Sequence, residues 1–243
     1  ENEDLLYKLL GINAELLIDH AWGYETTTIK DIKEYKPENN SISNGQVLHC
    51  PYDYKKARLI VSEMIDSLAL ELTEKEKMTN SIVLMIGYEI DNTFSYDGDI
   101  VTDYYGRRVP KPAHGHKTLD YSTSSSKILT SKCLELYDEI INKNLLVRRI
   151  NICACNVIDE KTAKKEVNFS QLDLFSDNNK VLEEKKEDKI KQNDEIKLQK
   201  TVTRLKNKYG KNIILKAMSL EEGATMKERN MQVGGHKGWN MIQ

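Results

Sequence analysis

The sequence is poor in the residues that mark several specialised classes of protein. It has four cysteines in 243 residues, and none of them forms a C-x-x-C pair. Cys153 and Cys155 stand two residues apart, which is the spacing of neighbours on one face of a strand. These features argue against a disulfide framework and a cysteine-based zinc site, and they indicate reduced, partly buried thiols.

Long apolar runs and a strong charge of one sign are also missing. No run approaches the roughly 18 apolar residues of a membrane span, and the start lacks the basic-then-apolar pattern of a secretory signal. We therefore expect a soluble, cytoplasmic protein without a membrane partner. The net charge is -2, so any nucleic-acid binding has to depend on local basic patches. The chain begins with Glu1 and not with Met, which suggests a fragment.

The apolar residues that are present suffice for one main domain with smaller pieces around it, at 39% hydrophobic and 30% charged residues. Residues 1–25 predict two short helices that end at Gly11 and Gly23. Residues 26–40 have no periodicity, contain Pro37 and are mostly polar. They predict a linker.

Residues 41–158 have the pattern of a β-α-β-β-α-β domain. Alternating or continuous apolar residues predict strands at 41–49, 81–89, 114–120 and 146–157. One helix is expected at 54–74, and a second from the Ser122–Ser126 cluster to Asn142. This order predicts an α+β domain with the ferredoxin-like split βαβ fold, a four-stranded antiparallel sheet with two helices on one face. Residues 94–112 form a polar excursion.

The other face of this sheet is expected to be free of helices. Its candidate side chains are polar or basic and come from three strands: Ser43, Gln46, His116, Thr118, Arg149 and Asn151. Such a face is either solvated or binds a partner, and the fold alone does not choose between the two.

The pentapeptide QLDLF, residues 171–175, follows the last strand by a polar stretch. It consists of Gln171, Leu172, Asp173, Leu174 and Phe175. A glutamine followed by spaced apolar residues has the form of a short peptide that fills a hydrophobic pocket on a partner. The alternative is that its apolar residues belong to the core of the preceding domain. Beyond it, residues 183–243 predict a mostly helical or flexible tail. The tail has a charged linker, a helix with Leu198, Val202, Leu205 and Tyr209 on one stripe, and a basic end.

Several segments together resemble the C-terminal half of a Y-family translesion DNA polymerase of the UmuC-like branch of Gram-positive bacteria. They are LLYKLLGINAELLIDHAWGYE, SISNGQVL, HGHKTLDYSTSSSK, LLVRRINICACNV and TMKERNMQVGGHKGW. The resemblance implies the end of a helical thumb at 1–25, a linker at 26–40 and a little-finger domain at 41–158. It also implies a clamp-binding segment at 159–182 and a charged and basic tail at 183–243.

This resemblance implies two partners. Duplex template-primer DNA is expected on the free sheet face, held by its phosphates without sequence preference. The sliding clamp (β subunit) is expected to bind QLDLF. Strand alternation allows only one of Arg148 and Arg149 to face DNA, and Arg149 is favoured because Ile150 and Ile152 take the opposite face. The expected DNA contacts are Arg149, Arg148, Lys117, His116, Thr118, Arg107, Arg108, Lys111, Ser43, Gln46 and Asn151.

The family's catalysis resembles two-metal phosphoryl transfer, in which palm carboxylates hold two Mg²⁺ ions. This chain shows no carboxylate pair on adjacent apolar strands, and Asp91, Asp97, Asp99 and Asp103 do not have EF-hand spacing. We therefore expect no catalytic residue, metal site or cofactor here, and Mg²⁺ only in a palm domain outside this chain. The fragment is expected to be a monomer and inactive alone.

Two other classes stay open. One is a non-catalytic ferredoxin-like module that binds RNA or a protein. RNA-binding sheets of this shape usually carry stacking aromatics, and none of the three phenylalanines falls on the proposed strands. The other is a small-molecule enzyme, for which the sequence offers no convergent acid, base and nucleophile.

Overall fold

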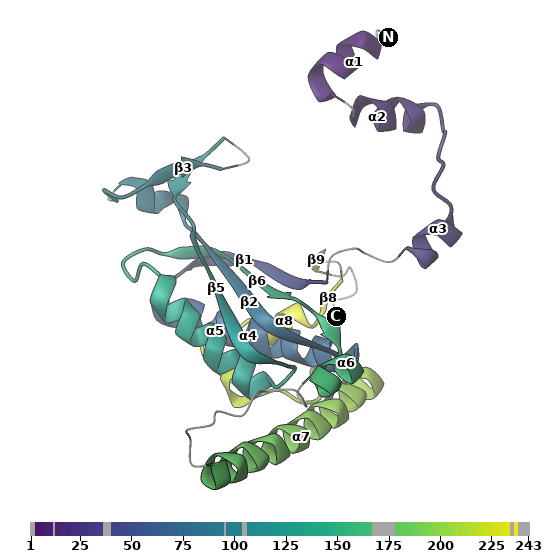
Figure 1. Ribbon diagram of the computed structural model, residues 1–243. Coiled ribbons are helices and arrows are strands. Elements are labelled where there is room, and N and C mark those ends of the chain that lie inside the picture. Colours follow the sequence, from purple (N-terminus) through teal and green to yellow (C-terminus); the bar gives the residue numbers. More distant parts are fainter. Residues whose placement is uncertain are drawn as a thin grey trace. The chain divides into compact units, whose positions relative to one another are not determined.

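The computed structural model describes residues 3–11, 13–35, 40–94, 96–103, 106–166, 178–233 and 236–237. The chain forms two compact units, Glu1–Asn39 and Asn40–Gln243, and each is described by itself (Figure 1).

The first unit consists of three short helices, α1 (Glu3–Leu10), α2 (Asn13–Ala21) and α3 (Ile29–Glu34). Gly11 and Gly23 follow α1 and α2 with positive φ angles, as expected of glycines that end helices. The helix α3 lies in the segment that the sequence predicts as a linker. Thr28 and Asp31 form a capping box at its start, so a local signal starts a helix where apolar periodicity is weak.

The second unit is built on an antiparallel sheet. Its strand order is β1 (Ile42–Tyr52), β6 (Val147–Cys155), β2 (Lys77–Tyr88) and β5 (Ala113–Thr123). The short β7 (Ile158–Asp159) pairs with the start of β2. Because β6 lies between β1 and β2, and β2 lies between β6 and β5, each strand–helix–strand half is split by a strand of the other. The α+β class and the split βαβ arrangement are thus confirmed.

Two long helices, α4 (Tyr54–Glu74) and α5 (Ser126–Ile140), pack on the same face of the sheet (Figure 1). The side chains of Asp53 and Ser125 cap their first turns. The core between helices and sheet is apolar throughout and includes the fully buried Ile60, Met64, Leu68, Leu129, Ile82, Leu84 and Ile150. Cys133 lies in this core, and burial raises the pKa of its thiol to about 12.

The polar excursion between β2 and β5 contains a small hairpin. A 3-10 turn, η1 (Ile90–Phe94), precedes β3 (Ile100–Thr102), which pairs with β4 (Arg108–Pro110). The hairpin extends beyond the end of the β2–β5 pair (Figure 1).

The C-terminal part adds a third layer. After α6 (Glu160–Glu166) come α7 (Asn178–Tyr209), η3 (Ala217–Leu220), α8 (Met226–Arg229) and the paired β8 (Gln232–Val233) and β9 (His236–Lys237). Three of these elements, α7, η3 and α8, contact α4. We call residues 193–231 the C-terminal layer; it packs on the helices and leaves the far face of the sheet uncovered (Figure 1).

Gly115 on β5 is required for the close packing of α5. A Cβ at this position would lie 2.8 Å from Ile140 Cγ2 and 2.9 Å from Leu136 Cδ1. We expect Gly115→Ala to lower the free energy of unfolding by about 1–3 kcal/mol through overpacking. Urea denaturation measures the change. Gly45→Ala is the matched control, because its Cβ would meet nothing nearer than Asn151 Oδ1 at 3.8 Å; equal losses in both variants would contradict the packing argument.

Candidate nucleic-acid interface

The sheet face turned away from α4 and α5 carries no helix of the second unit among its described residues (Figure 1). We call it the open face, and alternating burial along each strand defines its members. They are Ser43, Gly45, Val47 and His49 on β1, Arg149, Asn151, Cys153 and Cys155 on β6, Ser81, Val83, Met85 and Gly87 on β2, and His114, His116 and Thr118 on β5.

The strand register brings the predicted polar residues into neighbouring rows. Ser43 pairs with Cys153, which pairs with Val83, and Val83 pairs with His116. The next row holds Asn151 between a glycine of β1 and a methionine of β2. Five of the predicted contacts therefore share the open face: Ser43, His116, Thr118, Arg149 and Asn151. That they touch DNA stays a prediction.

Of the two adjacent arginines, Arg149 is the exposed one on the open face. It pairs with Val47 on one side and Gly87 on the other. The register between β2 and β6 shifts beside Arg148, and its Nε lies 3.4 Å from Glu89 Oε2. The sequence-based preference for Arg149 agrees with this placement, whereas Arg148 already has a carboxylate partner.

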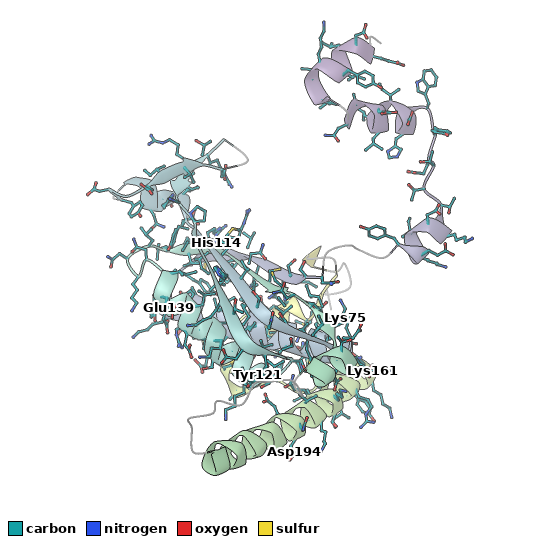
Figure 2. All side chains as sticks on the ribbon, in the orientation of Figure 1. Lys75, His114, Tyr121, Glu139, Lys161 and Asp194 are labelled. Carbon is teal, nitrogen blue, oxygen red and sulfur yellow. The ribbon has the colours of Figure 1, made fainter. Side chains whose placement is uncertain are left out.

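Two of the expected DNA contacts, Gln46 and Lys117, lie on the other side of the sheet. The amide Nε2 of Gln46 donates to Thr225 Oγ1 at 2.9 Å, so Gln46 faces the C-terminal layer. The ammonium of Lys117 lies 2.7 Å from Glu139 and 3.2 Å from Glu135, both on α5. The hydrogen bond to Glu139 raises the pKa of Lys117. Figure 2 labels Glu139 on this helix and His114 on the neighbouring strand. The prediction that Gln46 belongs to the free face is wrong, and Lys117 also lies on the helix side.

The three predicted cations of the excursion lie in or beside the β3–β4 hairpin. Arg107 Nη2 lies 2.7 Å from Asp103 Oδ2, and Lys111 Nζ lies 3.3 Å from Asp99 Oδ2. Arg108 is exposed on β4. The acidic neighbours of Arg107 and Lys111 offset their charge, so the hairpin adds less positive potential than its sequence suggests.

The predicted clamp-binding peptide, residues 171–175, lies outside the described residues. It stands in the sequence between α6, which ends at Glu166, and α7, which begins at Asn178. Both helices are fixed to the second unit. Ala163 of α6 and Ile196 of α7 are buried with Met78 in one small apolar cluster.

The serine cluster before α5 binds the protein's own tail. Glu195 of α7 accepts from Ser125 Oγ at 2.5 Å and from the Lys127 amide at 2.9 Å. Gln199 accepts from the Ser126 amide at 3.0 Å. A carboxylate at a helix N-terminus is favourable because the free amides there carry partial positive charge. These donors are thus occupied within the fold and lie away from the open face.

Sequence reasoning missed the polar residues that hold the C-terminal layer. The buried carboxylate of Glu63 on α4 accepts from the Thr225 amide at 2.8 Å and from the Met226 amide at 3.2 Å. Asp66, one turn further along, lies 2.6 Å from Lys216 Nζ. In the sequence, the only sign of this role is that Glu63 and Asp66 form an acidic pair at i, i+3 on one helix. Such a pair usually marks a solvated surface.

Cys153 and Cys155 are the two thiols of the open face, with their sulfur atoms 3.6 Å apart. Burial raises the pKa of Cys153 to about 11, with a further contribution from the hydrogen bond to Cys155. Cys50 stands exposed elsewhere on β1.

The described residues hold no group of three or more His, Cys, Asp or Glu side chains placed to bind a metal ion. The donor set of a two-Mg²⁺ centre is therefore not met by this part of the chain. No helix in the same part combines the length and hydropathy of a membrane span.

Comparison with known proteins identifies the family. Residues 39–174 match the impB/mucB/samB family C-terminal domain. The chain therefore belongs to this family, and the predicted resemblance to UmuC-like proteins is confirmed. A curated relative in Bacillus subtilis (strain 168), named "Putative UV-damage repair protein UvrX", is 26% identical over 235 residues. The match covers 96% of this chain and 47% of the relative, so the chain spans about half of that protein's length.

Solved structures of Dbh DNA polymerase are also similar. An insertion ternary complex is 19% identical, with a TM-score of 0.31 over 65% of this chain and 39% of that one. A post-insertion binary complex is 18% identical, with a TM-score of 0.32 over 65% and 40%. Because both TM-scores are low, the fold assignment rests on the sheet and helices described above.

Proposed function

We propose that this chain is the DNA-binding and clamp-recruitment portion of an error-prone translesion DNA polymerase that acts in DNA repair and damage tolerance in the cytoplasm. Membership of the impB/mucB/samB family and the UV-damage repair name of the Bacillus relative support the class. The observation that carries the DNA-binding part is the open face, which keeps Arg149, His116, Thr118 and Asn151 accessible while α4, α5 and the C-terminal layer pack on the opposite side.

The chemistry of the open face suits contact with phosphates. Hydroxyl, imidazole, amide and guanidinium groups donate hydrogen bonds to phosphate oxygens, and such contacts position a duplex without reading its sequence. Arg149 is the only lysine or arginine among the described strand residues of this face. One fixed cation gives modest affinity, since counterion release scales with the number of neutralised phosphates. A weakly held duplex is what a polymerase recruited by a second partner needs.

A salt series with primer-template duplex tests the DNA-binding proposal. We expect binding that weakens with salt and does not depend on sequence. Arg149→Ala should weaken binding about 3–10-fold and reduce the salt slope by about 1, because one phosphate contact is lost. Lys117→Ala is the matched control, since its ammonium is turned to Glu135 and Glu139 on α5. Fluorescence anisotropy measures both; binding that does not change with salt, or equal losses in the two variants, would overturn the proposal.

The remaining functions are divided between the tail and the rest of the full-length protein. The peptide at 171–175 is proposed to bind the sliding clamp (β subunit), one clamp protomer per polymerase monomer. Nucleotide addition is assigned to a palm domain outside this chain, where Mg²⁺ would activate the primer hydroxyl. The described residues lack that donor set, and the chain is proposed to be inactive alone.

A further inference from the structure

Cys153 and Cys155 form a pair of thiols that the DNA-binding proposal does not use. They are neighbours on the open-face side of β6, with Sγ atoms 3.6 Å apart. Cys153 pairs across the sheet with Ser43 and Val83, and Cys155 pairs with Ser81. These cross-strand neighbours have short side chains, and both thiols are partly exposed.

A direct disulfide between these cysteines fits the strand poorly. Two residues of a strand span about 6.6–6.8 Å between Cα atoms. Disulfides usually join Cα atoms about 4.4–6.8 Å apart with an S–S bond near 2.05 Å. The pair is therefore at the upper limit of this range, and bond formation would pull β6 out of register with β1 and β2. A single atom placed between the two sulfurs demands much less movement.

We propose that Cys153 and Cys155 are a dithiol site for trivalent arsenicals. Arsenic(III) forms two As–S bonds with a bent S–As–S angle, so the bridged sulfurs lie closer together than two bonds laid end to end. That arrangement matches two thiols already in contact on one strand face. The overall reaction releases no free proton, because both S–H protons leave in water with the oxygen of the arsenical.

The reaction balances without an oxidant or a reductant. An arylarsine oxide, R–As=O, reacts with the two thiols to give R–As(S–Cys)₂ and one molecule of water. Two S–H bonds break and two As–S bonds form. The arsenic–oxygen bond breaks, the oxygen takes both protons, and arsenic stays in the trivalent state.

The other cysteines supply internal controls. Cys50 is exposed and Cys133 is fully buried in the helix–sheet core. A single thiol forms one As–S bond, which an added monothiol reverses readily. The bridged product of a dithiol is lost only to a competing dithiol.

The test uses phenylarsine oxide and the intact mass of the folded chain. In the presence of excess β-mercaptoethanol, we expect one arsenical per chain on the wild type and on Cys50→Ser, and none on Cys153→Ser or Cys155→Ser. Ethanedithiol should remove the adduct. Retention by Cys153→Ser or Cys155→Ser, loss in Cys50→Ser, or failure of the wild type to bind would overturn the proposal.

A second measurement on the wild type covers the case of a variant that folds poorly. Phenylarsine oxide should protect Cys153 and Cys155 together from alkylation by iodoacetamide, while Cys50 is alkylated at its usual rate; peptide mapping reads each site. Equal protection of Cys50 would count against the dithiol site. Adduct formation is measured without DNA, so the arsenical proposal and the DNA-binding proposal are tested independently.

Discussion

Replacing Glu63 with alanine is expected to lower the free energy of unfolding by about 3 kcal/mol and to loosen the C-terminal layer. The Glu63 side chain is buried on α4, and one of its oxygens accepts from the amides of Thr225 and Met226. The other oxygen is buried without a hydrogen-bond partner among the described residues. Burial lowers the pKa of Arg229, and the negative charge of Glu63 partly offsets this effect. The substitution leaves two amide donors unpaired and a half-buried guanidinium without its counter-charge.

Urea denaturation gives the change in stability, and hydrogen exchange of residues 223–230 shows whether the layer loosens first. Glu71→Ala is the matched control, because Glu71 belongs to the same helix but makes only a surface pair with Lys75 at 2.7 Å. Such a pair contributes within about 0.5 kcal/mol. If Glu63→Ala behaved like Glu71→Ala, the C-terminal layer would not depend on this carboxylate.

The main domain follows from local signals in the sequence. The helix predicted at 54–74 coincides with α4, because Asp53 supplies an N-cap and the apolar stripe continues to Leu72. The four long strands appear where alternation or a continuous apolar run predicts them. The strand order does not follow from local signals, because the pairing of β6 with both β1 and β2 depends on residues far apart in the chain. The expectation of this order came from the β-α-β-β-α-β succession, which is that of the ferredoxin-like split βαβ motif.

The position of Gln46 and Lys117 on the helix side of the sheet has a simple geometric origin. Ser43 and Gln46 are three residues apart, so a regular strand places them on opposite faces. Lys117 stands between His116 and Thr118 and must likewise face away from them. Strict use of the two-residue period would have excluded both residues. What the sequence does not reveal is their partners, Thr225 in the distant tail and two glutamates on α5.

The C-terminal layer was beyond sequence reasoning for a physical reason. Apolar periodicity on α7 points to Leu198 and Tyr209, which are 63% and 59% exposed. The side of α7 that is buried contains Ile196, Gln199 and Thr203 instead. Gln199 donates to Thr73 Oγ1 at 3.0 Å and to the Ser124 carbonyl at 2.9 Å. Because the surface below is a helix N-terminus and polar side chains, the helix docks through hydrogen bonds, which leave no apolar stripe to detect.

This layer also changes where the functional unit ends. The family domain covers residues 39–174, whereas the second compact unit continues through the tail. Lys200 of α7 lies 2.7 Å from Glu160 at the start of α6, so the helices before and after residues 167–177 are joined to each other. The proposed clamp peptide is therefore flanked in the sequence by two helices of the second unit, α6 and α7.

The double substitution Leu174→Ala and Phe175→Ala is expected to abolish capture of this chain by the sliding clamp. Burying a leucine or phenylalanine side chain contributes about 1.5–3 kcal/mol, so losing both should weaken binding by more than about a hundredfold. Thermal melting should stay unchanged, because the buried cluster of Met78, Ala163 and Ile196 holds α6 and α7 on the second unit. Pull-down on immobilised clamp and a melting curve measure the two quantities.

Leu198→Ala is the control for removing an exposed leucine, since Leu198 of α7 is 63% exposed. It should leave capture by the clamp as it is. If the double substitution lowered the melting temperature as well as capture, Leu174 and Phe175 would be core residues of the domain and not clamp ligands. Capture that survives the double substitution would remove the clamp from the proposed partners. The proposed DNA contacts on the open face would be unaffected, because the peptide and the open face share no residue.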